Sequence, residues 1–240
     1  DALLLALMAA GIGAGDVVAT TPFTFIATAE VISLLGAVPV FVDIDPQTYN
    51  ISIDGVKALK SDDIRALITV DLYGQCAEYD EMEAFCRERG ITLIEDGAQS
   101  FGAEYKGRKA CTFGDIACTS FFPAKPLGCF GDGGAVFTAD EKLAGVMRVL
   151  RNHGQTARYM HSRIGINGRL DTLQAAVLLA KFDTFVGREI ELRNDVACRY
   201  GNALKSLAES GAIALPTVRE YNRSVWAQYS IRVPGKRDAL

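Results

Sequence analysis

The sequence predicts an α/β fold in which a mainly parallel sheet is covered by helices on both faces. Short apolar segments alternate with segments of helical periodicity along most of the chain. Two of the apolar segments, residues 66–70 and 91–94, lack the alternation of a half-exposed strand and therefore indicate strands buried on both faces. With 240 residues, 49% of them hydrophobic, the chain can bury a substantial core.

In the first part of the chain, the expected elements follow from apolar runs and the residues that interrupt them. Gly11, Gly36 and Gly90 mark helix ends, because glycine readily adopts the left-handed conformation that closes a helix. Asp54 is expected to cap a short helix. Helices are expected at residues 1–10, 25–35, 54–59 and 79–89, and strands at residues 17–21, 38–43, 66–70 and 91–94.

The second part is expected to complete the sheet and then change character. A strand at residues 116–122 and an apolar run at 135–137 precede helices at 140–151, where Asp140 is the cap, 173–182 and 185–207. Residues 152–169 read as a long irregular loop, and such a loop is more often functional than idle. Residues 226–233 are expected to be strand-like.

We divide the chain into a large domain, residues 1–185, and a smaller α+β domain that starts with a connecting helix, residues 186–240. A helix that begins at residue 1 suggests that chain is missing upstream, and the second domain is expected to continue beyond residue 240.

Composition excludes several classes of function. The net charge of −4 and the lack of a Lys/Arg-rich stripe argue against nucleic-acid binding as the main activity. No apolar stretch reaches the roughly 18–20 residues that a membrane span needs, and no signal peptide is evident. The six cysteines are scattered singly and there are only two histidines, so no metal site is expected. Single cysteines with reduced thiols indicate a cytoplasmic location. The glycines at residues 11–15 follow a helix and precede a strand, which is the wrong order for a dinucleotide fingerprint.

Lys125 is the most informative residue for function. It lies between Pro123 and Pro126, in a loop between two apolar segments, and burial can lower the pKa of a lysine by up to about 3–5 units. A neutral amine can form a Schiff base with a carbonyl compound or with pyridoxal 5′-phosphate (PLP). Most loop lysines are not catalytic, so this residue alone leaves a purely structural role open.

Two other polar residues are expected near Lys125. Asp96 follows one apolar strand and Ser120 lies near the end of another, and ligands of open α/β sheets bind outside the carboxyl ends of parallel strands. PLP needs an amine for its aldehyde, an anion beside its pyridine nitrogen and donors for its phosphate. The three side chains match these needs, although an aspartate after a strand is often a turn residue and a serine in a strand often has only a structural hydroxyl.

The order of several motifs resembles that of the DegT/DnrJ/EryC family of fold-type-I, PLP-dependent sugar aminotransferases. The resemblance covers nearly the whole chain. The family usually carries Ser-Gly-Thr before Asp1, often His at the position of Asp71 and more often Ala at the position of Gly97, and no function is assigned to these two substitutions. The matching segments are residues 11–16, 23–29, 36–45, 72–74, 95–103, 120–125 and 165–170.

The resemblance implies a role for each cofactor-binding residue. Lys125 would form the Schiff base with PLP and later transfer protons, and Asp96 would hold the pyridine nitrogen. Gln99 would lie beside the ring near its 3-hydroxyl, and Phe25 would stack on the ring. Ser120 would bind the phosphate.

Two further features complete the implied site. The helix that begins at Asp1 and Ala2 would offer its N-terminus to the phosphate, as helix N-termini do for anions. Asn167 would reach the phosphate of the cofactor in the partner subunit, which implies a homodimer with shared active sites.

The implied reaction is transamination from L-glutamate to a keto-sugar nucleotide. Within the family, the match is best to aminotransferases that act on the 3-keto group of UDP-2-acetamido-2-deoxy-3-oxo-glucuronic acid in lipopolysaccharide O-antigen biosynthesis. Arg169 fits a sugar carboxylate, because a guanidinium binds a carboxylate with two hydrogen bonds; a structural or diphosphate-binding role for this arginine is equally open.

Two further interpretations of the sequence stay open. The substrate can instead be a 4-keto UDP- or dTDP-sugar, or the chain can be a non-catalytic regulatory or binding module built on the same fold. Lys125 argues against the related dehydratases, in which the lysine is replaced.

Overall fold

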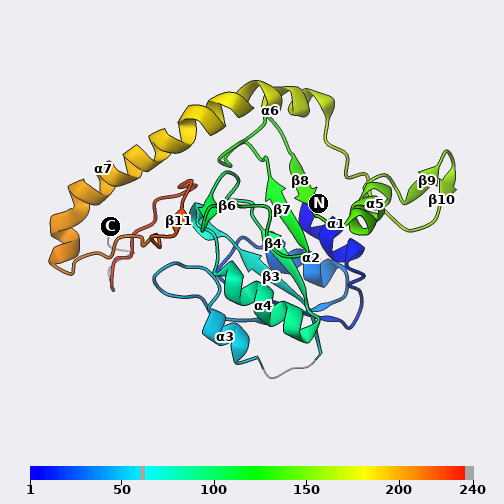
Figure 1. Cartoon of the computed structure of the whole chain (residues 1–240), viewed down its shortest axis with the longest axis horizontal. Coiled ribbons are helices and arrows are strands. Elements are labelled where there is room, and N and C mark those ends of the chain that lie inside the picture. The colour runs from blue at the N-terminus through cyan, green and yellow to red at the C-terminus, as the bar shows by residue number, and fades with distance from the viewer. Residues whose placement is uncertain (60–62, 236–240) are drawn as a thin grey trace.

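A six-stranded sheet forms the centre of the computed structural model, which describes residues 1–59 and 63–235. The strand order is β2-β1-β3-β4-β7-β8, and all neighbours are parallel except β7 and β8 (Figure 1). The α/β class with a mainly parallel sheet is therefore confirmed. The strands are β1 (Val17–Thr20), β2 (Val38–Phe41), β3 (Ile64–Val70), β4 (Thr92–Asp96), β7 (Ile116–Ser120) and β8 (Gly134–Phe137).

Helices cover both faces of this sheet. Helices α1 (Ala2–Ala9), α2 (Ala27–Leu34) and α5 (Glu141–Leu150) bury their apolar side chains in one core cluster with β1, β3, β4 and β7. Helices α3 (Ile53–Lys57) and α4 (Tyr79–Arg89) contribute to the core on the other face. Since successive strand residues point to opposite faces, β1, β3 and β4 each supply apolar side chains to both cores.

A long helical path arches over one edge of the molecule (Figure 1). It consists of α6 (Thr172–Thr184), a π-helical segment (Phe185–Glu189) and α7 (Ile190–Glu209). The expected helices at 173–182 and 185–207 are thus confirmed as parts of one path. The division of the chain into two domains at residue 185 stays a prediction.

Helix boundaries follow from local chemistry. Helix α4 buries Tyr79, Met82 and Cys86 and ends at Gly90, whose φ of 65° is left-handed as predicted. Asp140 caps α5 through its carboxylate, as expected. The cap of α3 is a correction: the Ser52 hydroxyl, not Asp54, accepts a hydrogen bond from the backbone of the third helical residue, at 3.2 Å.

Two expectations about irregular segments need correction. Residues 226–233 contain no strand, and the left-handed φ of 48° at Trp226 is incompatible with an extended start of the segment. Arg232 forms an isolated bridge with Ala214, and the Ala227 backbone N–H donates to the Tyr73 carbonyl at 2.9 Å. The nearby strand is β11 (Asn222–Arg223), which pairs with β5 (Glu104–Tyr105) beside β6 (Arg108–Lys109). The loop at 152–169 contains a short hairpin, β9 (Gln155–Ala157) with β10 (Met160–His161).

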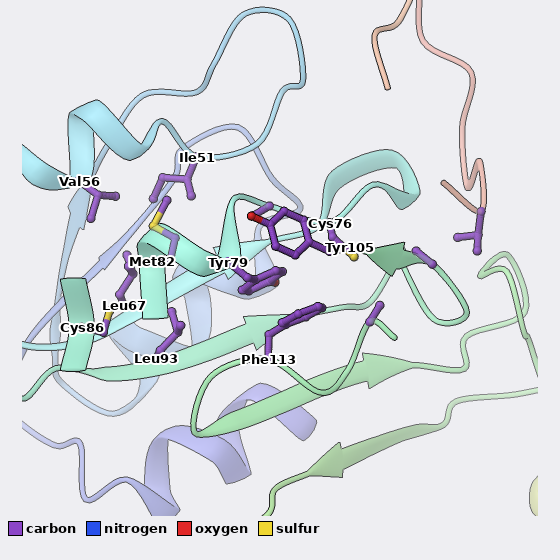
Figure 2. Packing of buried hydrophobic residues seen from close by; sticks show 14 of the residues in the cluster. Ile51, Val56, Leu67, Cys76, Tyr79, Met82, Cys86, Leu93, Tyr105 and Phe113 are labelled. Atoms are coloured by element: carbon purple, nitrogen blue, oxygen red, sulfur yellow. The ribbon is translucent and has the colours of Figure 1, made fainter. Parts of the chain in front are cut away.

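The core on the α4 face is built around stacked aromatic rings (Figure 2). The rings of Tyr79 and Phe113 are nearly parallel, with centroids 4.1 Å apart, and Tyr105 meets Phe113 edge-on. All three side chains are almost completely buried. This core packs α4 against β4, and the Phe113 backbone N–H donates to the Glu95 carboxylate of β4 at 2.9 Å.

Among residues 1–59 and 63–235, no helix combines the length and the apolar character that a membrane crossing requires. All six cysteines carry free thiols, and five of them are buried.

Candidate active site

Asp96 is the last residue of β4 and lies at the carboxyl end of the sheet. Its side chain is buried, and its carboxylate accepts hydrogen bonds from the Thr28 hydroxyl of α2 at 2.8 Å and from the Ala98 backbone at 3.2 Å. Burial raises the pKa of Asp96 above its usual value, while these hydrogen bonds and the charge of Lys125 act in the opposite direction. The site therefore contains a carboxylate that gains stability from a nearby positive charge.

Lys125 supplies that positive charge. It lies in the loop after β7, where its backbone N–H donates to the Phe122 carbonyl at 2.8 Å. Its side chain is half-buried, and desolvation lowers its pKa, with the charge of Asp96 opposing this shift. Asp96 ends β4 and Lys125 follows the neighbouring strand β7, and the charge of each influences the pKa of the other.

Ser120 lies beside the N-terminus of α1. Ser120 ends β7 and is the register partner of Gly134 on β8. The Cβ atom of Ala2 lies 3.7 Å from the place that a Cβ atom on residue 134 would take. The first N–H groups of a helix have no partner within the helix, and the Asp1 side chain does not cap them. Ser120 and these N–H groups thus form a neighbourhood of hydrogen-bond donors suited to an anion.

Gln99 is held by the turn that follows β3. Its side-chain carbonyl accepts a hydrogen bond from the Tyr73 backbone at 2.6 Å. Tyr73 lies in the turn Leu72–Gly74 and has a left-handed φ of 60°, which is uncommon for an aromatic residue. This hydrogen bond uses only the side-chain oxygen of Gln99, so the NH₂ group of the same amide can donate to a ligand.

Phe25, Asn167 and Arg169 are exposed in this structure. Phe25 precedes α2 and has 70% of its surface accessible. Asn167 accepts a hydrogen bond from the Arg169 side chain at 3.1 Å. Among the described residues, none of the three forms a hydrogen bond or ion pair with Lys125. Their roles toward the cofactor or substrate stay predictions.

Sequence reasoning missed three residues that support this site. Thr28 is buried in α2 and reaches Asp96 across 68 positions of sequence, so no local pattern could identify it. Asp71 and Glu95 are both fully buried. The sequence did contain a signal for these two residues: each is acidic and lies at the end of an apolar strand. An acidic residue in such a place is expected to be buried and to need hydrogen-bond donors.

The buried carboxylate and the half-buried lysine lie on a sheet whose fold is that of the aminotransferase class. The DegT/DnrJ/EryC1/StrS aminotransferase family matches residues 1–240, and the chain belongs to this family.

Three comparisons illustrate the relationship. The chain is 51% identical over 236 residues to a UDP-2-acetamido-2-deoxy-3-oxo-D-glucuronate aminotransferase from Pseudomonas aeruginosa, covering 98% of the chain and 64% of the relative. It is 45% identical over 240 residues to a pleiotropic regulatory protein from Geobacillus stearothermophilus, covering 100% of the chain and 64% of the relative. The structure of DesV from S. venezuelae in complex with a ketimine intermediate superimposes with a TM-score of 0.93 at 38% identity, covering 100% of the chain and 63% of DesV. The chain thus spans less than two thirds of the length of each.

The Asp96→Asn substitution tests the electrostatic coupling in the protein without cofactor. Removing the carboxylate charge should lower the pKa of Lys125 further, because Asp96 is the group that opposes the desolvation of the lysine. The rate at which an amine-specific reagent modifies Lys125, followed by peptide mass spectrometry, should therefore reach its plateau at a lower pH. Asp132→Asn, which removes an exposed carboxylate from the same loop region, is the control. An unchanged pH profile in Asp96→Asn would show that the two groups are not coupled.

Proposed function

We propose that this protein is a PLP-dependent aminotransferase that transfers the amino group of L-glutamate to the keto carbon of a nucleotide-linked sugar. The observation that carries the proposal is the mutual electrostatic influence of buried Asp96 and half-buried Lys125 at the carboxyl end of the sheet. Membership of an aminotransferase family supports the same chemistry.

The residues present fit PLP. Asp96 retains a carboxylate in a buried place where Thr28 and Ala98 are its hydrogen-bond donors, so a protonated pyridine nitrogen would find a matching anion. Ser120 and the α1 N-terminus offer donors to a phosphate. PLP, when bound, supplies an aldehyde that combines with an amine and a ring that accepts electrons.

The chain's own residues have distinct tasks in this reaction. Lys125 provides a primary amine whose lowered pKa favours the neutral, nucleophilic form, and its Nζ atom can take a proton from the donor substrate and return it to another carbon. The Asp96 carboxylate would stabilise the positive charge of a protonated pyridine nitrogen. Thr28 orients the Asp96 carboxylate, and Gln99 can donate its amide N–H groups to an oxygen of the cofactor.

For the sugar substrate, we propose a UDP-linked 2-acetamido-2-deoxy-3-oxo-glucuronic acid. The 51%-identical relative is named for this substrate, and exposed Arg169 can bind a carboxylate with two hydrogen bonds. We extend the proposal to lipopolysaccharide O-antigen biosynthesis, the pathway that the family resemblance of the sequence implies. Exposed Asn167 supports a homodimer in which it reaches the partner's cofactor, and the free thiols support a cytoplasmic location.

A regulatory module is the second candidate, because one 45%-identical relative is named a pleiotropic regulatory protein. A module that only binds a partner would need neither the amine of Lys125 nor its coupling to Asp96. The presence of both groups favours the enzyme.

The Lys125→Ala variant tests the proposed reaction. Transfer from glutamate to a UDP-3-keto-sugar should fall by at least about a thousand-fold, because the variant lacks both the amine nucleophile and the proton carrier. Lys142→Ala, which removes an exposed lysine on α5, should retain the activity of the unaltered protein. The assay is product formation by mass spectrometry, and undiminished turnover in Lys125→Ala would refute the scheme.

The Arg169→Ala variant tests the sugar carboxylate. Loss of a bidentate ion pair should lower kcat/KM for the uronic acid substrate by roughly 10- to 100-fold, and should change kcat/KM for the matching uncharged hexose by much less. Arg169→Lys should recover part of the loss because it keeps the charge but not the planar fork. Equal losses on the two sugars would assign Arg169 to another part of the substrate or to the loop structure.

A further inference from the structure

Asp71 and Glu95 form a buried pair of carboxyl groups on the α4 face of the sheet, opposite the face to which Asp96 points. Asp71 follows β3, Glu95 lies on β4, and both side chains are fully buried. In the described part of the chain, neither forms an ion pair with Lys or Arg. The pair therefore has no cation to compensate two negative charges.

Hydrogen bonds account for all the carboxyl oxygens of the pair. Asp71 accepts from the Ala77 backbone at 2.9 Å and from the Tyr79 hydroxyl at 2.8 Å through one oxygen. Its other oxygen accepts from the Ser100 hydroxyl at 2.8 Å. The oxygens of Glu95 accept from the backbone of Cys111 at 2.6 Å and of Phe113 at 2.9 Å.

The two carboxyl groups influence each other's pKa, because both are buried and, within residues 1–59 and 63–235, neither has a cation beside it. Burial raises the pKa of Asp71 to about 6. Burial and the neighbouring charge of Asp71 raise the pKa of Glu95 well above its usual range. Burial disfavours two uncompensated negative charges in this site, which favours the protonated form of Glu95 beside ionised Asp71.

The groups packed around the pair do not supply a competing charge. Burial raises the pKa of Tyr79, Cys76 and Cys111, so these groups stay neutral near pH 7. The charge of Glu95 contributes to raising the pKa of Arg108, but the Arg108 guanidinium is hydrogen-bonded to Glu83 through both terminal nitrogens and not to Glu95.

Asp71 connects the pair to both partners of the Tyr73–Gln99 hydrogen bond. Its carboxylate holds Ser100, the residue after Gln99, and its carbonyl accepts from Gly74, the residue after Tyr73, at 3.4 Å. The Asp71 backbone N–H donates to the Asp96 carbonyl at 3.1 Å. Asp71 therefore holds the turn after β3 against the turn after β4.

We propose that Asp71 and Glu95 share one proton and act as positioning residues that fix Gln99 at the cofactor site. The inference rests on the proposed function, because Gln99 is assigned to PLP. Asp71 works through Ser100 and the Leu72–Gly74 turn, and protonated Glu95 anchors Asp71 while it holds the 111–113 loop. Because the two turns are held together, the hydrogen bond from the Tyr73 backbone to the Gln99 side-chain carbonyl is kept in place. This hydrogen bond fixes the orientation of the Gln99 amide and of its N–H donors.

The first experiment detects the shared proton in the protein without cofactor. The infrared difference spectrum between the unaltered protein and Glu95→Gln at pH 7.5 should contain the C=O band of one buried protonated carboxyl. As the pH falls through about 6, a second band should appear and should be missing in Asp71→Asn, because the raised pKa of Asp71 places its proton uptake there. Absence of a protonated-carboxyl band at pH 7.5 would overturn the shared proton.

The second experiment is a double-mutant cycle on PLP affinity, measured by titration of the apo-protein. Gln99→Ala and Ser100→Ala should each weaken PLP binding by roughly 5- to 30-fold, and the double variant should bind no more weakly than the weaker single variant. Asp71→Asn should show the same non-additivity with Gln99→Ala. The control is Thr20→Val, which removes a buried hydroxyl bonded to the Ile68 carbonyl at 3.1 Å and should change the affinity less than twofold.

The two readouts separate failure of this inference from failure of the proposed function. If the unaltered protein does not bind PLP, the proposed function fails, and the positioning role toward PLP fails with it. If PLP binds and the losses of Ser100→Ala and Gln99→Ala multiply, Asp71 has only a structural role and the inference is overturned. Ser100→Ala keeps the carboxyl pair intact, so the cycle remains decisive even where Asp71→Asn does not fold.

Discussion

The burial of a carboxylate opposite an amine, at one edge of a parallel sheet, is the constraint on which the site depends. Asp96 loses most of its hydration, so its charged form needs donors and a positive neighbour. Thr28 supplies a hydrogen bond from α2 and Lys125 supplies the charge from the loop after β7. Neither Asp96 nor Lys125 is in its ordinary electrostatic state, and such perturbed groups are expected where chemistry takes place.

The sheet divides the supporting residues between its two faces. Adjacent residues of β4 point in opposite directions, so Asp96 faces α2 while Glu95 faces the aromatic core beside α4. Each acidic residue therefore has its own environment within the same strand. The proposed cofactor site lies on the Asp96 face, whereas on the Glu95 face Asp71 is hydrogen-bonded to Ser100, the residue after Gln99. Rigid strands can thus place reactive and supporting groups only one residue apart.

The sequence was sufficient to predict the α/β class and the convergence of Lys125 with Asp96, because both depend on strand order and on the carboxyl ends of parallel strands. The strand expected at 226–233 was wrong: Trp226 has a left-handed backbone, and its ring N–H donates to Asn194 of α7, a contact between distant segments that no local pattern shows. The Thr28–Asp96 and Ser100–Asp71 hydrogen bonds were missed because they join segments that are distant in the sequence. The presence of glycine at position 97, where the family more often has alanine, has a steric explanation. A Cβ atom at this position would lie 2.9 Å from the Cys111 sulfur.

The central claim is that Lys125 is the amine that binds PLP. The direct measurement is borohydride reduction of the PLP-loaded protein, followed by proteolysis and mass spectrometry of the peptides. The account predicts a pyridoxyl-phosphate adduct on the peptide that contains Lys125, located at its side chain by fragmentation. An adduct on a different lysine, or no reducible adduct in a protein that carries PLP, would contradict it.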